Sequence, residues 1–195
     1  MAPPVDQELD TRSRILRTAV NLYWRQGLGG TGVAQILTDS AAPRGSLYFH
    51  FPGGKEELAV EALTIAGRRV SDSLTQALAD NADTGEATSA FVLAFSRLLV
   101  SSDYELGCPL ATATLEAANS SERIRTVSVA TFARWRELIA EHLVVAGHSD
   151  VRAGQLAELA IASIEGSLIV ARANRSAEPL ATVAAVLREL LAPAG

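Results

Sequence analysis

Apolar residues recur at helical spacing through most of this chain, in stretches that glycine, proline and serine residues separate. The clearest stretch runs from about Lys55 to Leu78, where Leu58, Ala62 and the apolar residues after them follow one another every four positions. Alternating runs of β-branched residues are missing, and the abundance of alanine and leucine favours helix over strand. The sequence therefore predicts an all-α fold of about nine helices.

Breaks in these patterns indicate where the helices begin and end. Asp10 or Thr11 can cap the first helix, because a short oxygen-bearing side chain accepts hydrogen bonds from the first backbone N–H groups. Thr31 can cap the second helix in the same way, and Pro43 suits the first turn of the third helix, where a missing N–H costs nothing. The expected helices span about residues 11–26, 33–37, 44–50, 55–78, 87–102, 109–118, 121–146, 150–173 and 177–192.

Residues 44–51 read Arg-Gly-Ser-Leu-Tyr-Phe-His-Phe and give the clearest indication of function. With the two helices before them they form a unit of about fifty residues, the size of a helix-turn-helix head whose last helix enters the major groove. Gly45 and Ser46 keep the outer side of that helix low, and Arg44 can pair with guanine or hold a phosphate. The residues expected to hold the helix to the core are Leu47, Phe49 and Phe51.

Further residues are expected to hold the DNA backbone. Tyr48 and His50 can hydrogen-bond to phosphate oxygens. Lys55 opens the next helix, so its ammonium and the first N–H groups of that helix can clamp a phosphate. Thr31 can act as a cap through its hydroxyl while its backbone contacts phosphate. Taken singly, Tyr48 can instead cover the core, His50 can be structural and Arg44 can be a solvated charge, but their combined spacing favours DNA binding.

The charge distribution agrees with a head that binds a polyanion. The net charge of the whole chain is −5, which by itself argues against DNA binding. Residues 1–55 nevertheless carry six basic and four acidic groups, whereas residues 56–195 carry the other 11 basic and 18 acidic groups. A basic head on an acidic body can contact DNA with one end only, although asymmetries of this size also arise by chance in enzymes.

Residues 10–62 resemble the DNA-binding domain of the TetR/AcrR family of transcriptional regulators. The stretch 51–58 and Gly107-Cys108-Pro109 are similar to the subgroup around the lincomycin-resistance repressor LmrA. This resemblance implies a homodimer whose helix-turn-helix domains, residues 1–54, bind a palindromic operator. It also implies a helical domain, residues 55–195, that dimerises and binds a small molecule that releases the DNA. The residues that carry the resemblance are Thr31, Val33, Ile36, residues 44–51 and Lys55-Glu56-Glu57-Leu58.

The chain departs from the family pattern near the recognition helix. Ala41 stands where the family often has glycine, in the turn between the second and third helices. Alanine is disfavoured at positive φ, so we expect this turn to be adjusted or slightly strained. Pro43 stands where the family usually has serine or threonine, which removes a side-chain cap or phosphate contact.

Apolar residues in the last two helices step alternately by three and four positions, which suits closely packed helix pairs. Two such helices from each of two chains would make a four-helix dimer interface, with recognition helices about 34–36 Å apart. The alternative is that both helices pack only within their own domain. The residues of this seam are Leu156, Leu159, Ser163, Gly166, Val170, Leu180, Val183, Leu187 and Leu190.

The middle of the larger domain is the expected ligand site. Aromatic and apolar residues on single faces of three helices can enclose a cavity with few polar groups, as small-molecule sites usually do. Glu165 can be the polar group of this cavity or can face solvent, and an ordinary filled core is the alternative. The other residues expected to line the cavity are Phe91, Phe95, Cys108, Leu110, Trp135, Leu138 and His142.

Cys108 is the single cysteine of the chain, which excludes an intrachain disulfide and a cysteine-based zinc cluster. It precedes Pro109 at a helix start, where the helix dipole lowers the pKa of a thiol. A redox switch needs a resolving partner, so we expect Cys108 to serve in packing.

The alternative function is that of a helical small-molecule-binding protein or enzyme without specific DNA binding, but neither an enzyme nor a membrane protein is indicated. The three histidines lack metal-ligand spacing, and no phosphate-binding glycine loop follows a strand, so no catalytic residue, metal or cofactor is expected. The longest run without charged residues is 13 residues, Gln26 to Thr38, too short to span a bilayer. The first residues lack a signal-peptide pattern, so a cytoplasmic location is expected.

Overall fold

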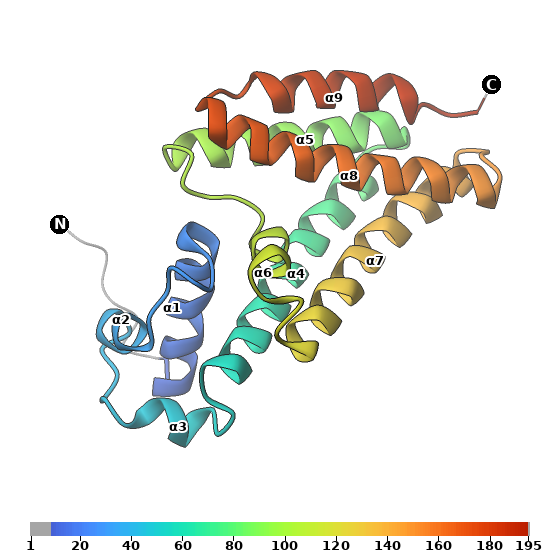
Figure 1. Cartoon of the computed structure of the whole chain (residues 1–195). Coiled ribbons are helices and arrows are strands. Elements are labelled where there is room, and N and C mark those ends of the chain that lie inside the picture. The colour runs from blue at the N-terminus through green and yellow to red at the C-terminus, as the bar shows by residue number, and fades with distance from the viewer. Residues whose placement is uncertain (1–8, 195) are drawn as a thin grey trace.

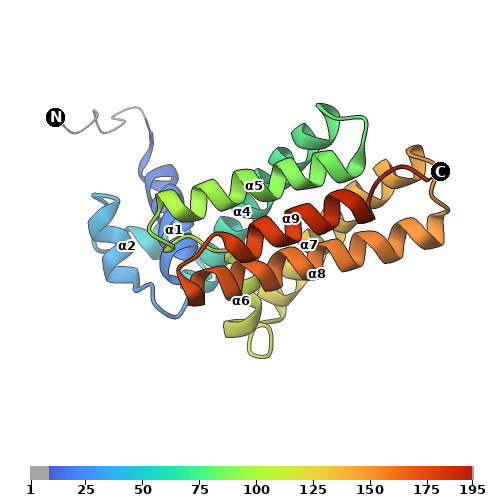
Figure 2. The same ribbon diagram turned by 90° about the horizontal axis from the view of Figure 1, so that it is seen from above.

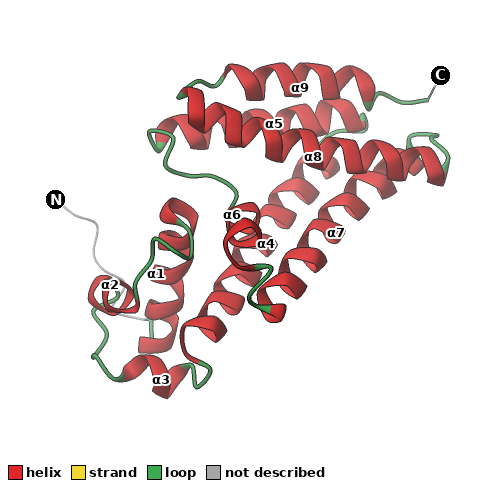
Figure 3. Ribbon diagram, viewed as in Figure 1, coloured by secondary structure: helices red, strands yellow, loops and turns green. Residues whose placement is uncertain are grey.

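The computed structural model describes residues 9–194, and over this range it consists of nine α-helices without a strand (Figures 1 and 3). The all-α prediction is confirmed, and every predicted helix end lies within three residues of an observed one. Residues 1–8, on which the signal-peptide prediction rested, and Gly195 lie outside the described residues. The helices are α1 (Thr11–Gln26), α2 (Val33–Asp39), α3 (Ser46–His50), α4 (Gly54–Ala79), α5 (Thr84–Ser101), α6 (Pro109–Ala117), α7 (Glu122–Val145), α8 (Asp150–Asn174) and α9 (Glu178–Leu190).

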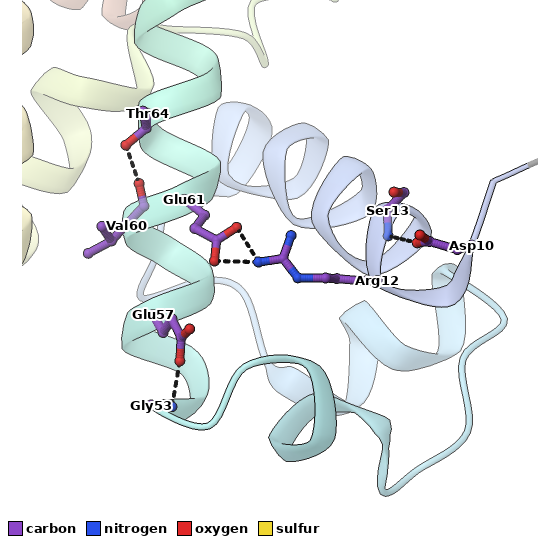
Figure 4. Close-up of polar contacts among 8 residues, drawn as sticks. All are labelled: Asp10, Arg12, Ser13, Gly53, Glu57, Val60, Glu61 and Thr64. Carbon is purple, nitrogen blue, oxygen red and sulfur yellow. Dashed lines mark hydrogen bonds and ion pairs between the residues drawn. The ribbon is translucent and has the colours of Figure 1, made fainter.

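Helix α1 begins and ends as its sequence predicts. The Asp10 carboxylate accepts a hydrogen bond from the backbone N–H of Ser13 at 2.7 Å (Figure 4), which satisfies one of the free donors of the first turn. Gly27 ends the helix with φ of 72°, a conformation that glycine adopts without steric cost. Between these ends, Ile15, Ala19 and Tyr23 are buried along one face.

Two predictions about the second and third helices are wrong. Thr31 does not cap α2: the cap is Gly32, without a side-chain hydrogen bond, and the buried Thr31 hydroxyl donates to the carbonyl of Gly27 at 2.6 Å instead. Pro43 does not open α3, because the helix begins at Ser46 with Gly45 as its cap. Both residues do lie close to a helix start, as predicted. They belong to the turn before the helix, where the Thr31 hydroxyl bonds to Gly27 and the Pro43 carbonyl accepts the N–H of Ser46.

The turn between α2 and α3 contains the expected strain. Ala41 has φ of 51°, in the left-handed region that costs an L-residue about 1–2 kcal/mol. Arg14 supports this turn from α1, because its guanidinium donates to the carbonyls of Ser40 at 3.1 Å and Ala41 at 3.5 Å. The recognition helix therefore leaves the turn in a direction that α1 fixes.

Helix α4 joins the head, formed by α1–α3, to the body, formed by the remaining helices (Figure 1). The Arg12 guanidinium on α1 donates to both carboxylate oxygens of Glu61 on α4, at 2.7 and 2.8 Å (Figure 4). The four-residue apolar repeat of α4 is buried as predicted, at Leu58, Ala62, Ala66, Val70, Leu74 and Leu78.

The body is built from packed helix pairs. Helix α9 packs against both α5 and α8, and the view from above shows these three helices side by side (Figure 2). Helix α7 packs against α4 and α8, while the short helix α6 contacts α1, α4 and α7. Helix α6 therefore lies where the head meets the body.

Part of the predicted dimer seam faces inward. Leu156, Leu180 and Leu187 are 2%, 0% and 2% exposed. They belong to the core of this single chain, so the prediction that they form the dimer interface is wrong. Leu159 and Val170 are half exposed, at 50% and 47%. Apolar residues spaced by three and four positions occur both on a buried helix face and on an interface face. Periodicity alone therefore did not separate the inner from the outer side of each helix.

Candidate nucleic-acid interface and ligand cavity

Two residues anchor the segment of α3, and two aromatic residues between them are exposed. Leu47 is 1% exposed and Phe51 is 0% exposed, so these residues hold the helix to the core. Tyr48 and Phe49 are 70% and 81% exposed, and the prediction that Phe49 anchors the helix is wrong. Residues four apart share a face of a helix, and Phe49 lies between them on the opposite side. The sequence prediction therefore missed Phe49 as a surface residue of the recognition helix.

Neighbouring residues fix the orientation of α3. The guanidinium of Arg12 stacks on the ring of Phe51, 4.7 Å from its centroid. Gly54 has φ of 66°, and a Cβ on it would lie 3.1 Å from the Tyr48 ring. Since the glycine both permits this backbone conformation and leaves room for the ring, Gly54 positions Tyr48 on the outer surface.

The start of α3 is open. Arg44 and Gly45 are exposed, and a Cβ on Gly45 would meet nothing within 4 Å. The small size of Gly45 therefore serves no contact within the chain. The hydroxyl of the half-buried Ser46 donates to the carbonyl of Pro43 at 2.6 Å, which keeps this corner compact.

The remaining residues predicted to contact DNA differ in how accessible they are. His50 is half buried, and its ring packs edge-on against Phe49 with centroids 4.9 Å apart. The ammonium of Lys55 donates to the carbonyl of Leu28 at 2.8 Å, so it is attached to the turn between α1 and α2. The Thr31 side chain is completely buried and therefore presents no hydroxyl to a ligand.

Five of the eight residues predicted to bind a ligand surround one cavity in the body. The cavity has a volume of about 20 Å³, room for about one water molecule. Sequence reasoning missed the contribution of α4 and most of that of α8, whose apolar residues resemble ordinary core positions. The predicted residues that line it are Phe91, Phe95, Cys108, Trp135 and Glu165, and those missed are Val70, Leu74, Ile139, Ile161, Ile164 and Leu168.

The other three predicted ligand residues lie elsewhere. Leu110 is completely buried and Leu138 is 7% exposed, and neither lines the cavity. The Nδ1 atom of His142 is 2.8 Å from the hydroxyl of Thr84, so this histidine helps to join α7 to the start of α5. Leu138 and His142 share α7 with the lining residues Trp135 and Ile139, and Leu110 follows the lining residue Cys108 by two positions.

Burial controls the two ionisable groups of the cavity. Burial raises the pKa of Glu165 to about 7, although a hydrogen bond with Cys108 acts in the opposite direction. The Oε2 atom of Glu165 is buried without a hydrogen-bond partner among the described residues. Burial, followed by the nearby Glu165 carboxylate, raises the pKa of the Cys108 thiol well above its usual value. The expected lowering by the helix dipole is therefore wrong at this position.

A short path of contacts joins the cavity to the head. Cys108 caps α6, and the carboxylate of Glu116 near the other end of this helix accepts hydrogen bonds from the N–H groups of Leu28 and Gly29, at 2.7 and 3.1 Å. Leu28 is also the residue whose carbonyl holds Lys55. Helix α6 is thus bonded to the turn that precedes the helix-turn-helix.

Metal-binding groups and membrane-spanning helices are two further features that bear on function. Within residues 9–194, no group of His, Cys, Asp and Glu side chains is arranged to hold a metal ion. None of the helices in this part of the chain combines the length and hydropathy that crossing a bilayer requires.

Comparisons with known proteins place the chain in a family. A model of the tetR family of bacterial regulatory proteins matches residues 15–62, and one of the C-terminal domain of LmrA/YxaF-like transcriptional regulators matches residues 84–186. The HTH-type transcriptional regulator YxaF of Bacillus subtilis is 36% identical over 175 residues, which cover 90% of this chain and 92% of YxaF. The regulator LmrA of the same bacterium is 31% identical over 182 residues, which cover 93% of this chain and 97% of LmrA.

The fold agrees with these sequence matches. The crystal structure of a TetR transcriptional regulator from Legionella pneumophila superposes with a TM-score of 0.84 at 21% identity, over 95% of this chain and 99% of that one. The predicted family is confirmed: the chain belongs to the TetR family of DNA-binding transcriptional regulators, in the group that resembles LmrA and YxaF.

Proposed function

We propose that this protein is a ligand-responsive repressor that acts in the cytoplasm. Residues 1–54 bind DNA and residues 55–195 dimerise and bind the effector. Two copies bind a palindromic operator through their α3 helices, and the small-molecule effector releases the DNA. The observation that carries this proposal is the exposed surface at α3, where Tyr48 of the anchored helix and Arg44 and Gly45 just before it are open to solvent.

The outer sides of α8 and α9 support the homodimer. Leu159, Val170 and Val186 are 50%, 47% and 56% exposed, and a groove of about 660 Å³ runs between the two helices. A Cβ on Gly166 would meet nothing within 4 Å, so this glycine leaves room that packing within the chain does not use. Close approach of a partner helix is a physical use for such room. Ser163, Val183 and Leu190, which are half buried, complete the proposed interface.

The closed cavity and α6 support control by an effector. A cavity of about 20 Å³ admits an organic molecule only if its walls move. Cys108 is both a wall residue and the cap of α6, so movement there is transmitted to Glu116 and the turn at Leu28. An effector that prefers the opened body then changes the position of the head, and with it the affinity for DNA.

Selection of bound genomic fragments, followed by fluorescence anisotropy, tests the proposal. We expect tight binding to a palindrome, weak binding to a scrambled duplex, and affinity that falls steeply with salt concentration. Arg44→Ala should lower affinity for the palindrome by about 1–3 kcal/mol and relax sequence preference. The matched control is Arg152→Ala, an exposed arginine at the start of α8. Equal affinity for palindromic and scrambled DNA at all salt concentrations would refute specific operator binding.

The dimer requires a separate experiment. Val170→Asp places a charge on the proposed interface without disturbing a buried residue, so sedimentation should show a folded monomer. The monomer should bind one half-site weakly and lose its preference for the intact palindrome. A Val170→Asp protein that remains dimeric would place the interface elsewhere.

A further inference from the structure

A second, open depression lies beside the closed cavity. This groove has a volume of about 360 Å³, within the range of sites that hold small organic ligands. One wall comes from Tyr104 and α6, and the other comes from α8. Cys108, Glu165 and Leu168 line both the groove and the closed cavity, so they separate the two. The groove is thus the outer approach to the cavity, and it offers room that the cavity lacks.

A cation stands at one end of the groove. The Nε–H of Arg172 donates to the carbonyl of Tyr104 at 3.2 Å, and Arg172 forms no ion pair with any acidic residue among residues 9–194. Its neighbour Arg175 is different, because that guanidinium pairs with Asp103 and stacks on the Tyr104 ring. The terminal nitrogens of Arg172 form no hydrogen bond or ion pair with residues 9–194, although Nη1 lies close to Gly107. They can therefore bind a planar anion, which a guanidinium holds through parallel hydrogen bonds.

An unsatisfied acceptor stands at the other end. The Oε2 atom of Glu165 is buried and receives no hydrogen bond from the described residues, an arrangement that costs free energy until a donor arrives. The raised pKa of this carboxyl, about 7 because of burial, agrees with the missing donor. Glu165 and Arg172 are seven residues apart on α8, which corresponds to about 10 Å along the helix.

Between these two groups the groove is lined by apolar side chains together with the polar Thr112 of α6. Leu168 and Ile169 of α8 face Ala111 and Leu115 of α6 across the groove. Leu115 is 80% exposed and Ile169 is 57% exposed, so both present apolar surface to a molecule in the groove. A flat hydrocarbon ring system would cover this strip while its two ends reach the polar groups.

We infer that the groove binds a flat aromatic acid about 10 Å long, with its carboxylate on Arg172 and a hydroxyl at its far end that donates to Glu165. This inference rests on the proposed function in one respect, because it supplies the chemical class of the effector. The ligand would lie directly on α6, the helix whose Glu116 holds the head.

The proposed dimer leaves this site open. Successive residues of an α-helix are about 100° apart around its axis. Glu165 and Arg172 therefore lie on one side of α8, whereas Gly166 and Val170 of the proposed interface lie about 100–160° away. A partner chain seated on α8 and α9 would not fill the groove.

Titration calorimetry of the full chain without DNA tests the inference with three probes of one shape. The probes are 6-hydroxy-2-naphthoate, 2-naphthoate without the hydroxyl, and 6-hydroxy-2-naphthamide without the charge. We expect the hydroxy acid to bind about tenfold more tightly than the amide, because only the acid forms a charge-assisted pair. Arg172→Gln should abolish this preference. The control Arg152→Gln, which changes an exposed arginine at the other end of α8, should retain it. Equal affinities of acid and amide, or an equal effect of the two substitutions, would overturn the site.

The hydroxyl end has its own test. 2-Naphthoate should bind several-fold more weakly than the hydroxy acid, and Glu165→Leu should make the two affinities equal, because leucine offers no acceptor. If the hydroxyl has no effect on binding to the unmodified protein, the assignment of Glu165 is wrong, and this comparison of two probes requires no substituted protein.

Adding the hydroxy acid to the protein–operator complex separates the two proposals. Binding without release of DNA supports the site and contradicts its role as the effector site, whereas normal operator binding with no probe bound overturns the site alone.

Discussion

The head and the body use aromatic residues in opposite ways. In the head, Tyr48 and Phe49 of α3 are 70% and 81% exposed, whereas in the body Phe91 and Trp135 are 8% and 2% exposed. Helix α3 has five residues and lies at the edge of the molecule (Figure 1). Helices α5 and α7 have 18 and 24 residues and are packed between neighbours. The surroundings of a helix, more than the type of its residues, decide which aromatic side chains are buried.

This contrast has a functional meaning. Under the proposed function, a surface that binds a large polar partner keeps its contact groups outside, so only Leu47 of α3 and Phe51 at its end act as anchors. The aromatic residues of the body instead line a small cavity that helices surround. Four predictions sharpen or break the contrast, and they follow in order of decreasing effect.

The largest effect is expected within the recognition segment itself. Phe51→Ala should lower the free energy of unfolding by about 3–5 kcal/mol, because it empties a completely buried ring site. Phe49→Ala should change it by less than about 0.5 kcal/mol, since the ring is exposed. Urea denaturation followed by circular dichroism measures both. Similar losses for the two variants would mean that Phe49 is buried after all.

A methyl group should matter more inside the body than at the surface. A Cβ on Gly85 of α5 would lie 2.1 Å from the carbonyl oxygen of Arg188 on α9, so Gly85→Ala should destabilise the fold by about 2–3 kcal/mol through overpacking. The control is Gly154→Ala on α8, where a Cβ would meet nothing within 4 Å. This control should gain about 0.5–1 kcal/mol from helix propensity. Thermal unfolding of both variants decides, and a neutral Gly85→Ala would show that α5 and α9 separate easily.

The buried acid of the body makes stability depend on pH. The pKa of Glu165 is about 7 in the folded chain and 4.5 for an unperturbed glutamate. Between these values the folded state keeps a proton that the unfolded state has released, so stability falls as pH rises through this window and levels off above it. The loss should amount to about 2–3 kcal/mol.

Glu165→Gln provides the control, because an amide does not titrate. The difference in unfolding free energy between this variant and the unmodified protein should grow in favour of the variant from pH 5 to pH 8. Urea denaturation at the two pH values measures it. A difference that is independent of pH would mean that Glu165 is solvated in the folded chain.

The smallest effect concerns the strained turn of the head. Ala41→Gly should raise the free energy of unfolding by about 0.5–1 kcal/mol, because glycine adopts a φ of 51° without the steric cost that alanine bears. Ala42→Gly, one residue later and without positive φ, should instead reduce stability through added freedom of the unfolded chain. Thermal melts of the two variants should therefore shift in opposite directions.

Local features of the sequence determined the helices, their ends and the position of the recognition segment. Asp10 and Gly27 mark the ends of α1 through short-range hydrogen bonds and backbone preference, and the four-residue repeat of α4 reports one buried face. These features depend on a few neighbouring residues, so a single sequence contains them. The strain at Ala41 was instead expected from the family resemblance, because the family often has glycine at this turn position.

Only the tertiary structure decided which side of each element faces inward and which distant residues meet. Leu156 and Leu187 have the spacing of an interface yet lie in the core, and Phe49 has the character of a core residue yet lies outside. The groove that contains Arg172 and Glu165 is lined by α6 and by α8, about fifty residues further along the chain. Helical periodicity gives the direction of a side chain relative to its own helix, whereas packing between helices decides what that side chain touches.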